Sequence, residues 1–348
     1  MLTRDFDFDL PESAIAQEPA ARGASRLLVL DAEGAARHRQ VGDLPELLEP
    51  GDLVVVNDTR VIPARLLGHR RLPDGSTGGR VEILLVERIA EREWQALTRP
   101  GKKTRPGSKI LLDGGLEAEV LALLPGDGRH HVRFSTALEP HLETIGHVPL
   151  PPYIKRSDRL EDRERYQTVF AREPGAIAAP TAGLHLTTEI LARLAARGIE
   201  VASVTLHVGI GTFKPVTAEL VHEHVMESER WELPAATAEA LQRTRARGGR
   251  IVAIGTTVVR TLESAARANG LTAGTGRTEL FITPGFEFQA VDVLFTNFHL
   301  PCSTLLMLVS AFAGRERVLA AYREAIAGGY RFYSYGDAMV VEKRHQGL

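Results

Sequence analysis

The sequence predicts an α/β layer domain, formed by both ends of the chain, with an inserted small β-barrel domain. Three observations predict this fold class. Short apolar runs that end in turn formers lie within the first sixty residues, turn-punctuated strands without a helical period fill residues 64–135, and strands alternating with amphipathic helices follow. A chain of 348 residues is long enough for two domains. We expect an α/β catalytic domain of residues 1–60 plus 150–348 and an inserted β-barrel domain of residues 61–149.

Two buried strands are expected before the insertion, at residues 26–31 and 52–57. Both runs are rich in Leu and Val, and both end in Asp or Asn. Short apolar runs closed by turn formers are typical of buried strands.

The inserted segment is expected to contain short strands separated by Gly and Pro. Closely spaced strands with turn signals between them favour a small barrel. The expected strands cover residues 80–87, 93–98, 109–112, 116–120 and 131–135.

After residue 150, helices and strands are expected to alternate. Threonines that can cap a helix precede two of the amphipathic segments, and glycines follow two of them. The expected order is a helix from Thr187 or Thr188 to Gly198, strand 200–206, helix 235–247, strand 250–254 and a helix from Thr256 or Thr257.

The composition excludes a generic basic coat for nucleic acid and a polybasic membrane binder. Lys plus Arg number 42 against 44 Asp plus Glu, and 44% of the residues are apolar. The single cysteine, Cys302, excludes disulfides within the chain and multi-cysteine metal sites. Residues 305–313, the longest strongly apolar stretch, are too few to span a bilayer, and the amino terminus has no targeting pattern. We expect a cytoplasmic monomer.

Polar and glycine-rich segments lie at the ends of several expected strands, where ligands bind in open α/β sheets. Three histidines lie among them, and converging histidines favour a site, although a lone histidine in apolar surroundings is more often structural. The candidate residues are Asn57, Asp58 and Arg60; Thr181, Gly183 and His185; His207, Gly209 and Gly211; Thr256 and Thr257; and Asn297 and His299.

Simpler explanations stay open for some of these segments. The glycines at 209–211 form only a fragment of the dinucleotide fingerprint, and the threonines at 256–257 can cap a helix as well as help to bind an anion. The histidines at 222–224, with glutamates nearby, suggest zinc at first sight. Their spacing on a charged segment is more typical of an exposed surface, so we expect no metal.

Ten segments of the chain carry a more specific pattern. They are 5–13 (DFDFDLPES), 57–65 (NDTRVIPAR), 146–154 (GHVPLPPYI), 166–170 (YQTVF), 179–185 (APTAGLH), 205–213 (TLHVGIGTF), 255–263 (GTTVVRTLE), 296–301 (TNFHLP), 303–314 (STLLMLVSAFAG) and 335–339 (YGDAM). In this order they resemble a bacterial family, the S-adenosylmethionine:tRNA ribosyltransferase-isomerases of queuosine biosynthesis. The resemblance is weakest at residues 66–145.

Four positions depart from the family pattern. Glu227 stands where the family usually has a second histidine, which argues against an obligatory histidine there. Leu186, Val258 and Cys302 replace an aromatic residue, a serine and a charged residue.

The resemblance implies an unusual use of S-adenosylmethionine, with no further cofactor. Its ribosyl part is transferred to the aminomethyl nitrogen of 7-aminomethyl-7-deazaguanine at the wobble position of a tRNA. Rearrangement gives epoxyqueuosine, and adenine and methionine are released. The sulfonium acidifies its neighbouring CH₂ and the amine must lose a proton before attack, so the reaction needs groups that exchange protons near neutral pH.

On this basis we expect His185 and His207 to transfer protons, with Asp58 and Glu263 as charged partners. A purely structural role for both histidines stays open. The residues expected to bind S-adenosylmethionine are Asn57, Arg60, Thr181, Gly183, Gly209, Gly211, Thr256, Thr257, Asn297 and His299.

Attraction to tRNA phosphates must be local, because the chain as a whole is slightly acidic. Residues 61–150 contain 13 Lys or Arg against 11 Asp or Glu, and the run 99–109 contains no acidic residue. We expect tRNA to be bound by this run, although a solvated loop is a serious alternative. The expected contacts are Lys102, Lys103, Arg105 and Lys109, with Lys155 and Arg156 further along the chain.

Two other functions stay open on the sequence. An ordinary S-adenosylmethionine-dependent RNA methyltransferase needs a complete glycine-rich loop after an early strand, which is not found. A non-catalytic RNA-binding protein needs a more basic surface and exposed aromatic residues, yet only 6% of the residues are aromatic.

Overall fold

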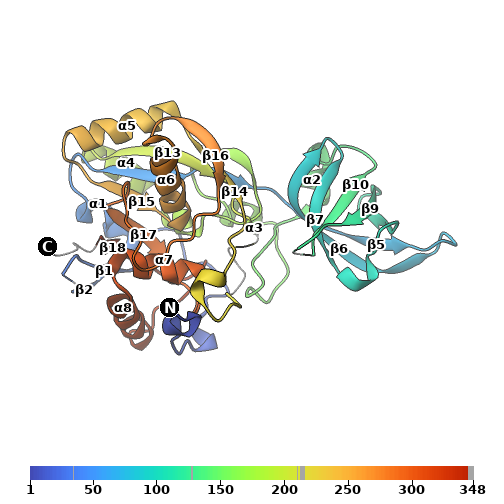
Figure 1. The fold of residues 1–348 in the computed structure, drawn as a ribbon, viewed down its shortest axis with the longest axis horizontal. Helices are drawn as coiled ribbons and strands as arrows, with labels where there is room; N and C mark the ends of the chain where they lie inside the picture. Colours follow the sequence, from blue (N-terminus) through green and yellow to red (C-terminus); the bar gives the residue numbers. More distant parts are fainter. Residues whose placement is uncertain (34, 127, 210, 212–215, 344–348) are drawn as a thin grey trace. The chain divides into compact units, whose positions relative to one another are not determined.

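The computed structural model describes residues 1–33, 35–126, 128–209, 211 and 216–343. The chain forms two compact units (Figure 1). The first unit contains residues 1–60, 167–173 and the chain from residue 179 onward, and the second contains residues 61–166 and 174–178. The predicted fold class is confirmed: a large mixed sheet with helices occurs together with a closed antiparallel barrel.

Within the described residues, the first unit is built on a nine-stranded sheet with the order β16-β14-β13-β3-β15-β17-β18-β1-β2. Strands β13, β3, β15 and β17 run parallel to their neighbours in this series, and β17 pairs antiparallel with β18. The strands are β1 (Arg26–Leu30), β2 (Ala36–Gln40), β3 (Leu53–Asn57), β13 (Glu200–Leu206), β14 (Glu229–Leu233), β15 (Ile251–Ile254), β16 (Gly274–Thr278), β17 (Val293–Asn297) and β18 (Ala338–Glu342).

The central strands β3, β15 and β17 are buried along their whole length. Their continuous Val, Ile, Leu and Phe runs reflect a parallel sheet that is covered on both faces. One core cluster joins Val54 and Ile254 of the sheet to Ile190 and Leu194 of a helix. Asn57 of β3 and Thr296 and Asn297 of β17, at the carboxyl ends of these strands, are the polar exceptions in the runs.

Helices cover this sheet and begin close to the predicted places. Thr187 caps the helix that follows it, because its hydroxyl accepts the backbone N–H of Ile190 at 3.1 Å. The helix from Thr256 begins after Gly255, whose φ of +95° favours glycine. The helices of the first unit are α1 (Leu44–Leu47), α4 (Thr188–Ala196), α5 (Ala235–Ala246), α6 (Thr256–Asn269), α7 (Thr304–Ala313) and α8 (Arg315–Ala327), with 3₁₀ turns η1 (Thr3–Phe6), η2 (Glu12–Ala14), η3 (Val41–Asp43), η5 (Thr181–His185) and η7 (Val221–Glu223).

The second unit is a closed barrel in the described residues, with the strand order β5-β6-β7-β10-β9-β8 and a return pairing of β8 with β5. Closure depends on Gly68, because a Cβ there would overlap the backbone of Leu111 on the neighbouring strand. The elements are β5 (Arg65–Arg71), β6 (Thr77–Ala90), β7 (Glu93–Arg99), η4 (Gly101–Lys103), β8 (Lys109–Leu112), β9 (Glu117–Leu123), β10 (His130–Phe134), α2 (Glu139–Ile145), β11 (Gly146–His147) and α3 (Asp162–Arg165). A separate two-stranded sheet pairs β4 (Thr59–Val61) with β12 (Glu173–Ala176).

Residues 150–166, expected in the α/β domain, lie with the barrel unit. Ion pairs and hydrogen bonds hold them there. Arg65 of β5 binds Asp158 at 2.5 Å, and Arg163 donates to the carbonyl oxygen of Gly146 at 2.8 Å. Among the described residues, no helix has both the length and the apolar character needed to cross a membrane.

Candidate active site at the carboxyl ends of the parallel strands

A small cavity of about 40 Å³, partly open to solvent, lies in the first unit where β15 and β17 end. Ligands bind at this edge of an open α/β sheet, because loops and helix starts converge there. Segments far apart in the sequence contribute to its wall, which mixes hydroxyl, amide and small apolar groups. The lining residues are Ala179, Pro180, Thr181, Ala182, Val208, Gly255, Thr256, Thr257, Thr296, Asn297, His299, Leu305, Tyr333 and Ser334.

Asn297 fixes the relative positions of several wall segments. Its Oδ1 accepts a hydrogen bond from the hydroxyl of Thr181 at 3.1 Å. Its Nδ2 lies 2.9 Å from Nε2 of His185 and donates to the carbonyl oxygen of Tyr333 at 3.2 Å. The amide is 98% buried, so these partners replace water.

Two buried histidines next to this amide are neutral at pH 7. Burial lowers the pKa of His185 to about 4, and the charge of Arg331 adds to the effect. Burial also lowers the pKa of His299 to about 3. Nε2 of His299 lies 2.9 Å from the hydroxyl of Thr296, and its backbone N–H donates to the hydroxyl of Tyr322. Both imidazoles therefore supply neutral hydrogen-bonding groups rather than positive charge.

Asn57 connects the end of β3 to the cavity wall. Its Nδ2 donates to the hydroxyl of Thr257 at 3.2 Å and to the carbonyl oxygen of Leu206 at 3.0 Å. Its Oδ1 accepts the backbone N–H groups of Leu206 and Thr59. The side chain holds the ends of β3 and β13 against the first turn of α6.

A second polar cluster continues from Asn57 through Thr59 to His207. The hydroxyl of Thr59 lies 2.9 Å from Nδ1 of His207. The buried carboxylate of Asp58 accepts hydrogen bonds from the hydroxyl of Thr205 at 2.7 Å and from Arg172 at 2.6 Å. Burial lowers the pKa of His207, the charge of Arg230 lowers it further, and Asp58 acts in the opposite direction.

The glycine segment after β13 is held by an ion pair that the sequence patterns did not reveal. The backbone N–H of Gly209 donates to Oε1 of Glu229 at 2.9 Å. Glu229 also binds Arg260 of α6, and both side chains are 94% buried. Glu227 packs against Gly211, where a Cβ would lie 2.9 Å from the carboxyl carbon. Residues 210 and 212–213 of this sequence block lie outside the described residues.

Half of the residues expected to bind S-adenosylmethionine line the cavity: Thr181, Thr256, Thr257, Asn297 and His299. Asn57 and Gly209 do not line the cavity. Asn57 donates a hydrogen bond to Thr257, and the N–H of Gly209 donates to Glu229. Gly183 packs against Phe170 and Thr168, Gly211 packs against Glu227, and Arg60 is exposed. The sequence patterns did not single out Tyr333 or Leu305, because an aromatic or apolar residue looks like ordinary core.

Glu263, expected as a charged catalytic partner, has a different environment. Its carboxylate is fully buried and accepts the backbone N–H groups of Gln289, Ala290 and Val291 at 3.0, 2.9 and 3.2 Å. Arg267 donates to the same carboxylate at 2.7 Å. Through these hydrogen bonds the carboxylate supports the segment before β17. Glu263 is not among the residues that line the cavity.

The segment containing His222 and His224 does not assemble a set of metal ligands. Glu229, the nearby carboxylate, is occupied by Arg260 and by the N–H of Gly209. In the described part of the chain, no group of three or more His, Cys, Asp or Glu side chains is placed to hold a metal ion.

The basic side chains of residues 99–109, in the second unit, are exposed, and hydrogen bonds fix the backbone that carries them. Thr104 is buried and donates to the carbonyl oxygen of Pro100 at 3.0 Å, and Arg70 donates to the carbonyl oxygen of Lys103 at 3.1 Å. The side chains of Lys102, Lys103, Arg105 and Lys109 are exposed. None of these four forms an ion pair with a described residue.

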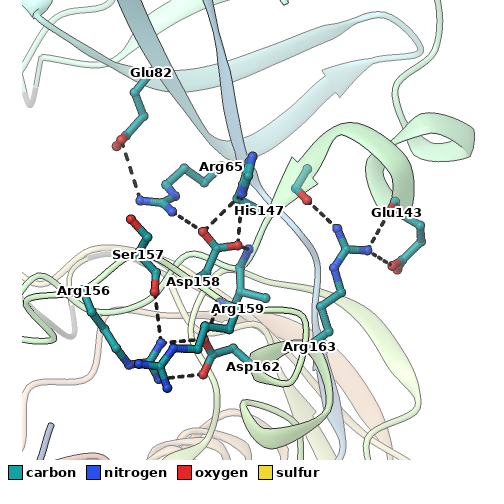
Figure 2. A network of polar contacts seen from close by, with 12 residues as sticks. Arg65, Glu82, Glu143, His147, Arg156, Ser157, Asp158, Arg159, Asp162 and Arg163 are labelled. Carbon is teal, nitrogen blue, oxygen red and sulfur yellow. Dashed lines mark hydrogen bonds and ion pairs between the residues drawn. The ribbon is translucent and has the colours of Figure 1, made fainter. Parts of the chain in front are cut away.

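The segment that carries Lys155 and Arg156 is organised by two carboxylates (Figure 2). Asp162 accepts two hydrogen bonds from Arg156, at 2.6 and 2.8 Å, so this guanidinium is occupied within the chain. Asp158 lies between Arg65 and His147, and its distance from Nδ1 of His147 is 3.1 Å. Lys155 is exposed. The arginine therefore shapes this segment.

Comparison with known proteins places this architecture in one family. A family model described as "Queuosine biosynthesis protein" matches residues 3–341. The S-adenosylmethionine:tRNA ribosyltransferase-isomerase of Gloeobacter violaceus is 57% identical over 98% of this chain and 96% of its own length. The enzyme of the same name from Anaeromyxobacter sp. is 57% identical over 99% of this chain and the whole of its own. The crystal structure of S-adenosylmethionine tRNA ribosyltransferase from Thermotoga maritima is 41% identical, covers 97% of this chain and 99% of its own, and superposes with a TM-score of 0.56.

Proposed function

This chain belongs to the queuosine biosynthesis protein family, and from that membership we propose that it is an S-adenosylmethionine:tRNA ribosyltransferase-isomerase. The observation that carries the proposal is identity at 57% over nearly the whole length of both chains. The enzyme transfers the ribosyl part of S-adenosylmethionine to 7-aminomethyl-7-deazaguanine in tRNA and rearranges it, which gives epoxyqueuosine. Adenine and methionine are the released products.

The reaction needs two proton acceptors and one proton donor. A new bond forms between the amine nitrogen and the ribosyl carbon that loses adenine. The carbon that loses sulfur gains a carbon–carbon bond, which closes the cyclopentane ring, and a bond to the former ring oxygen, which makes the epoxide, while that oxygen leaves the carbon that carried adenine. One proton leaves the amine and one leaves the carbon next to sulfur; one is taken up by the departing adenine, so one is released overall. The electrons of the carbon–sulfur bond stay on methionine, and no redox partner is required.

The cavity at the ends of β15 and β17 is the proposed site for S-adenosylmethionine. Its wall combines hydroxyl, amide and small apolar groups, which is the mixture typical of small-molecule sites. The first turn of α6 lacks a side-chain cap, so the backbone N–H groups of Thr256 and Thr257 suit the methionine carboxylate. Thr181, Asn297 and His299 supply neutral hydrogen-bonding groups for the ribose and adenine.

His207 is the proposed proton acceptor. Thr59 orients its Nδ1, and its lowered pKa keeps the imidazole neutral and able to take a proton at pH 7. Asp58 holds the same strand end through Thr205 and provides negative charge that favours the protonated imidazole. His185, whose Nε2 faces the amide of Asn297, is assigned a positioning role.

The basic run at Lys102, Lys103, Arg105 and Lys109 is the proposed tRNA-binding surface. These cations are exposed and make no ion pair with a described residue, so phosphates meet no competing carboxylate partner. Lys155 adds a cation from a separate segment of the same unit. Arg156 contributes by holding this segment through Asp162.

One assay tests the proposed function and separates it from its alternatives. The protein is incubated with S-adenosylmethionine and with tRNA that carries 7-aminomethyl-7-deazaguanine, and the small molecules are separated. Release of adenine and methionine in equal amounts is the expected result. S-adenosylhomocysteine would identify a methyltransferase, and tRNA binding with neither product would identify a binding protein. Unmodified tRNA, which lacks the amine, is the negative control.

A further inference from the structure

Tyr333 has a backbone conformation that bulky residues rarely adopt. Its φ is +76°, in the left-handed region that favours glycine and asparagine. A residue in this region persists only when its surroundings hold it there, and such residues cluster at ligand sites.

The chain that leaves β17 holds Tyr333 from both sides. The backbone N–H of Tyr333 donates to the carbonyl oxygen of Phe298 at 3.0 Å. Its carbonyl oxygen accepts Nδ2 of Asn297 at 3.2 Å and the N–H of Gly336 at 2.9 Å. Since Asn297 also binds Thr181 and His185, one buried amide couples the strained turn to η5.

The strained turn places an aromatic ring in the wall of the cavity. Among the described residues that line this cavity, two carry flat aromatic rings, Tyr333 and His299. The apolar residues around them are small or aliphatic, such as Ala182, Val208 and Leu305. Burial raises the pKa of Tyr333, so its phenol stays neutral. The phenol ring is thus the larger of two flat, uncharged rings in the wall, and the smaller one, the imidazole of His299, is held by the hydroxyl of Thr296.

We propose that Tyr333 is the specificity-determining residue that stacks on the adenine of S-adenosylmethionine and orients it for departure. This inference rests on the proposed function and names the purine-contacting side chain within the proposed site. Adenine is the leaving group, so its plane must be fixed while its bond to the ribosyl carbon breaks. The residue with the strained backbone is thus also one that lines the cavity wall.

The decisive variants separate the ring from the backbone conformation. Tyr333→Asn removes the ring while asparagine still accepts a positive φ, and Tyr333→Phe keeps the ring. Base–aromatic stacking typically changes affinity by about 5- to 150-fold. We expect Tyr333→Asn to raise the KM for S-adenosylmethionine, and the inhibition constant for added adenine, by about 10-fold or more. Tyr333→Phe should change both by less than about 3-fold, and inhibition by methionine should be unchanged in both variants.

A buried tyrosine outside the cavity provides the matched control. Tyr330 is buried and is absent from the cavity lining, so Tyr330→Leu should lower stability without changing inhibition by adenine. Equal loss of adenine and methionine inhibition in Tyr333→Asn, or no loss of either, would overturn the inference. Direct calorimetric titration of adenosine into wild type and Tyr333→Asn keeps the test independent of turnover. If wild type binds adenosine but releases no adenine from S-adenosylmethionine, the proposed function fails while the ring contact is still measured.

Discussion

Nδ2 of Asn297 lies 2.9 Å from Nε2 of His185, and the amide that makes this contact is buried. Because an amide nitrogen can only donate, Nε2 is the acceptor and the proton of the neutral ring lies on Nδ1. The same amide binds Thr181 and Tyr333. One side chain at the end of β17 therefore fixes the tautomer of a neutral histidine and connects segments of the cavity wall.

The first prediction concerns acid stability. The folded-state pKa values of His185 and His299, about 4 and about 3, lie below the value near 6.5 of an unfolded histidine. The unfolded chain then binds more protons than the folded one below pH 6.5, so the free energy of unfolding falls as the pH falls. The expected loss between pH 6.5 and 5 is about 2 kcal/mol for each histidine. Urea unfolding at both pH values measures it.

Variants assign this loss to individual residues. His299→Gln should remove about half of the extra pH dependence, because glutamine does not titrate. His222→Gln changes an exposed histidine and serves as the control. A stability that is the same at pH 6.5 and 5 in wild type would contradict the buried, neutral state of both side chains.

The second prediction concerns proton transfer. His207→Ala should fold normally and lose about 10²- to 10⁴-fold in turnover, which is the usual contribution of one general acid or base. Thr59→Val, which removes the hydroxyl at 2.9 Å from Nδ1, should reduce turnover less and alter the pH profile. Rates of adenine release from pH 5 to 9 check both variants. Because the pKa of His207 is lowered, the acid limb should lie below pH 6.5. Near-normal turnover in His207→Ala would exclude this residue as the base.

The third prediction separates support from catalysis at Glu263. Its carboxylate accepts three backbone N–H groups and binds Arg267. Glu263→Gln should therefore lower the free energy of unfolding by about 1–3 kcal/mol, because buried donors lose their acceptor. The kcat of adenine release at 25 °C should stay within about 3-fold of wild type. A 100-fold loss of kcat with unchanged unfolding would instead show that Glu263 is a catalytic group.

The fourth prediction concerns the buried pair of Glu229 and Arg260. Breaking one side of a buried pair leaves an uncompensated charge and costs about 3–5 kcal/mol. Arg260→Met should show a loss of this size in urea unfolding, while the double variant with Glu229→Gln should recover a large part of it. Arg243→Ala, which breaks an exposed pair with Glu200, is the control and should cost at most about 1 kcal/mol. Equal losses in Arg260→Met and the double variant would contradict a coupled pair.

Local patterns were sufficient for much of the fold. Strands β3 and β15 were predicted because their apolar runs end in turn formers, and the start of α4 because Thr187 can cap a helix. Strand β5 was missed, since Arg and His dominate its exposed half and hide the alternation. The sheet order was also beyond prediction, because neighbours such as β18 and β1 are separated by three hundred residues of chain.

Part of the cavity lining could be predicted where polar residues directly follow strands, as at Asn297 and the threonines that begin α6. The environment of Glu263 could not be predicted. The N–H groups that its carboxylate binds lie 26 to 28 residues further along the chain, and no local pattern indicates them. Tyr333 was missed for a related reason. Its positive φ depends on hydrogen bonds to the end of β17, which follow from the tertiary fold alone.

The last prediction concerns tRNA. Lys102, Lys103 and Arg105 are exposed on a loop whose backbone is held by Thr104 and Arg70, and they pair with no described carboxylate. Changing all three to glutamine should weaken tRNA binding and reduce the salt dependence of log K by roughly 0.7–0.9 for each lost phosphate contact. Affinity for S-adenosylmethionine should not change. Fluorescence anisotropy with labelled tRNA at 50 to 200 mM salt measures the slope. Arg156→Gln provides a matched comparison: because this guanidinium is occupied by Asp162, the variant should lower stability rather than the slope. An unchanged slope in the triple variant would place the phosphate contacts elsewhere, with Lys155→Gln as the next substitution to measure.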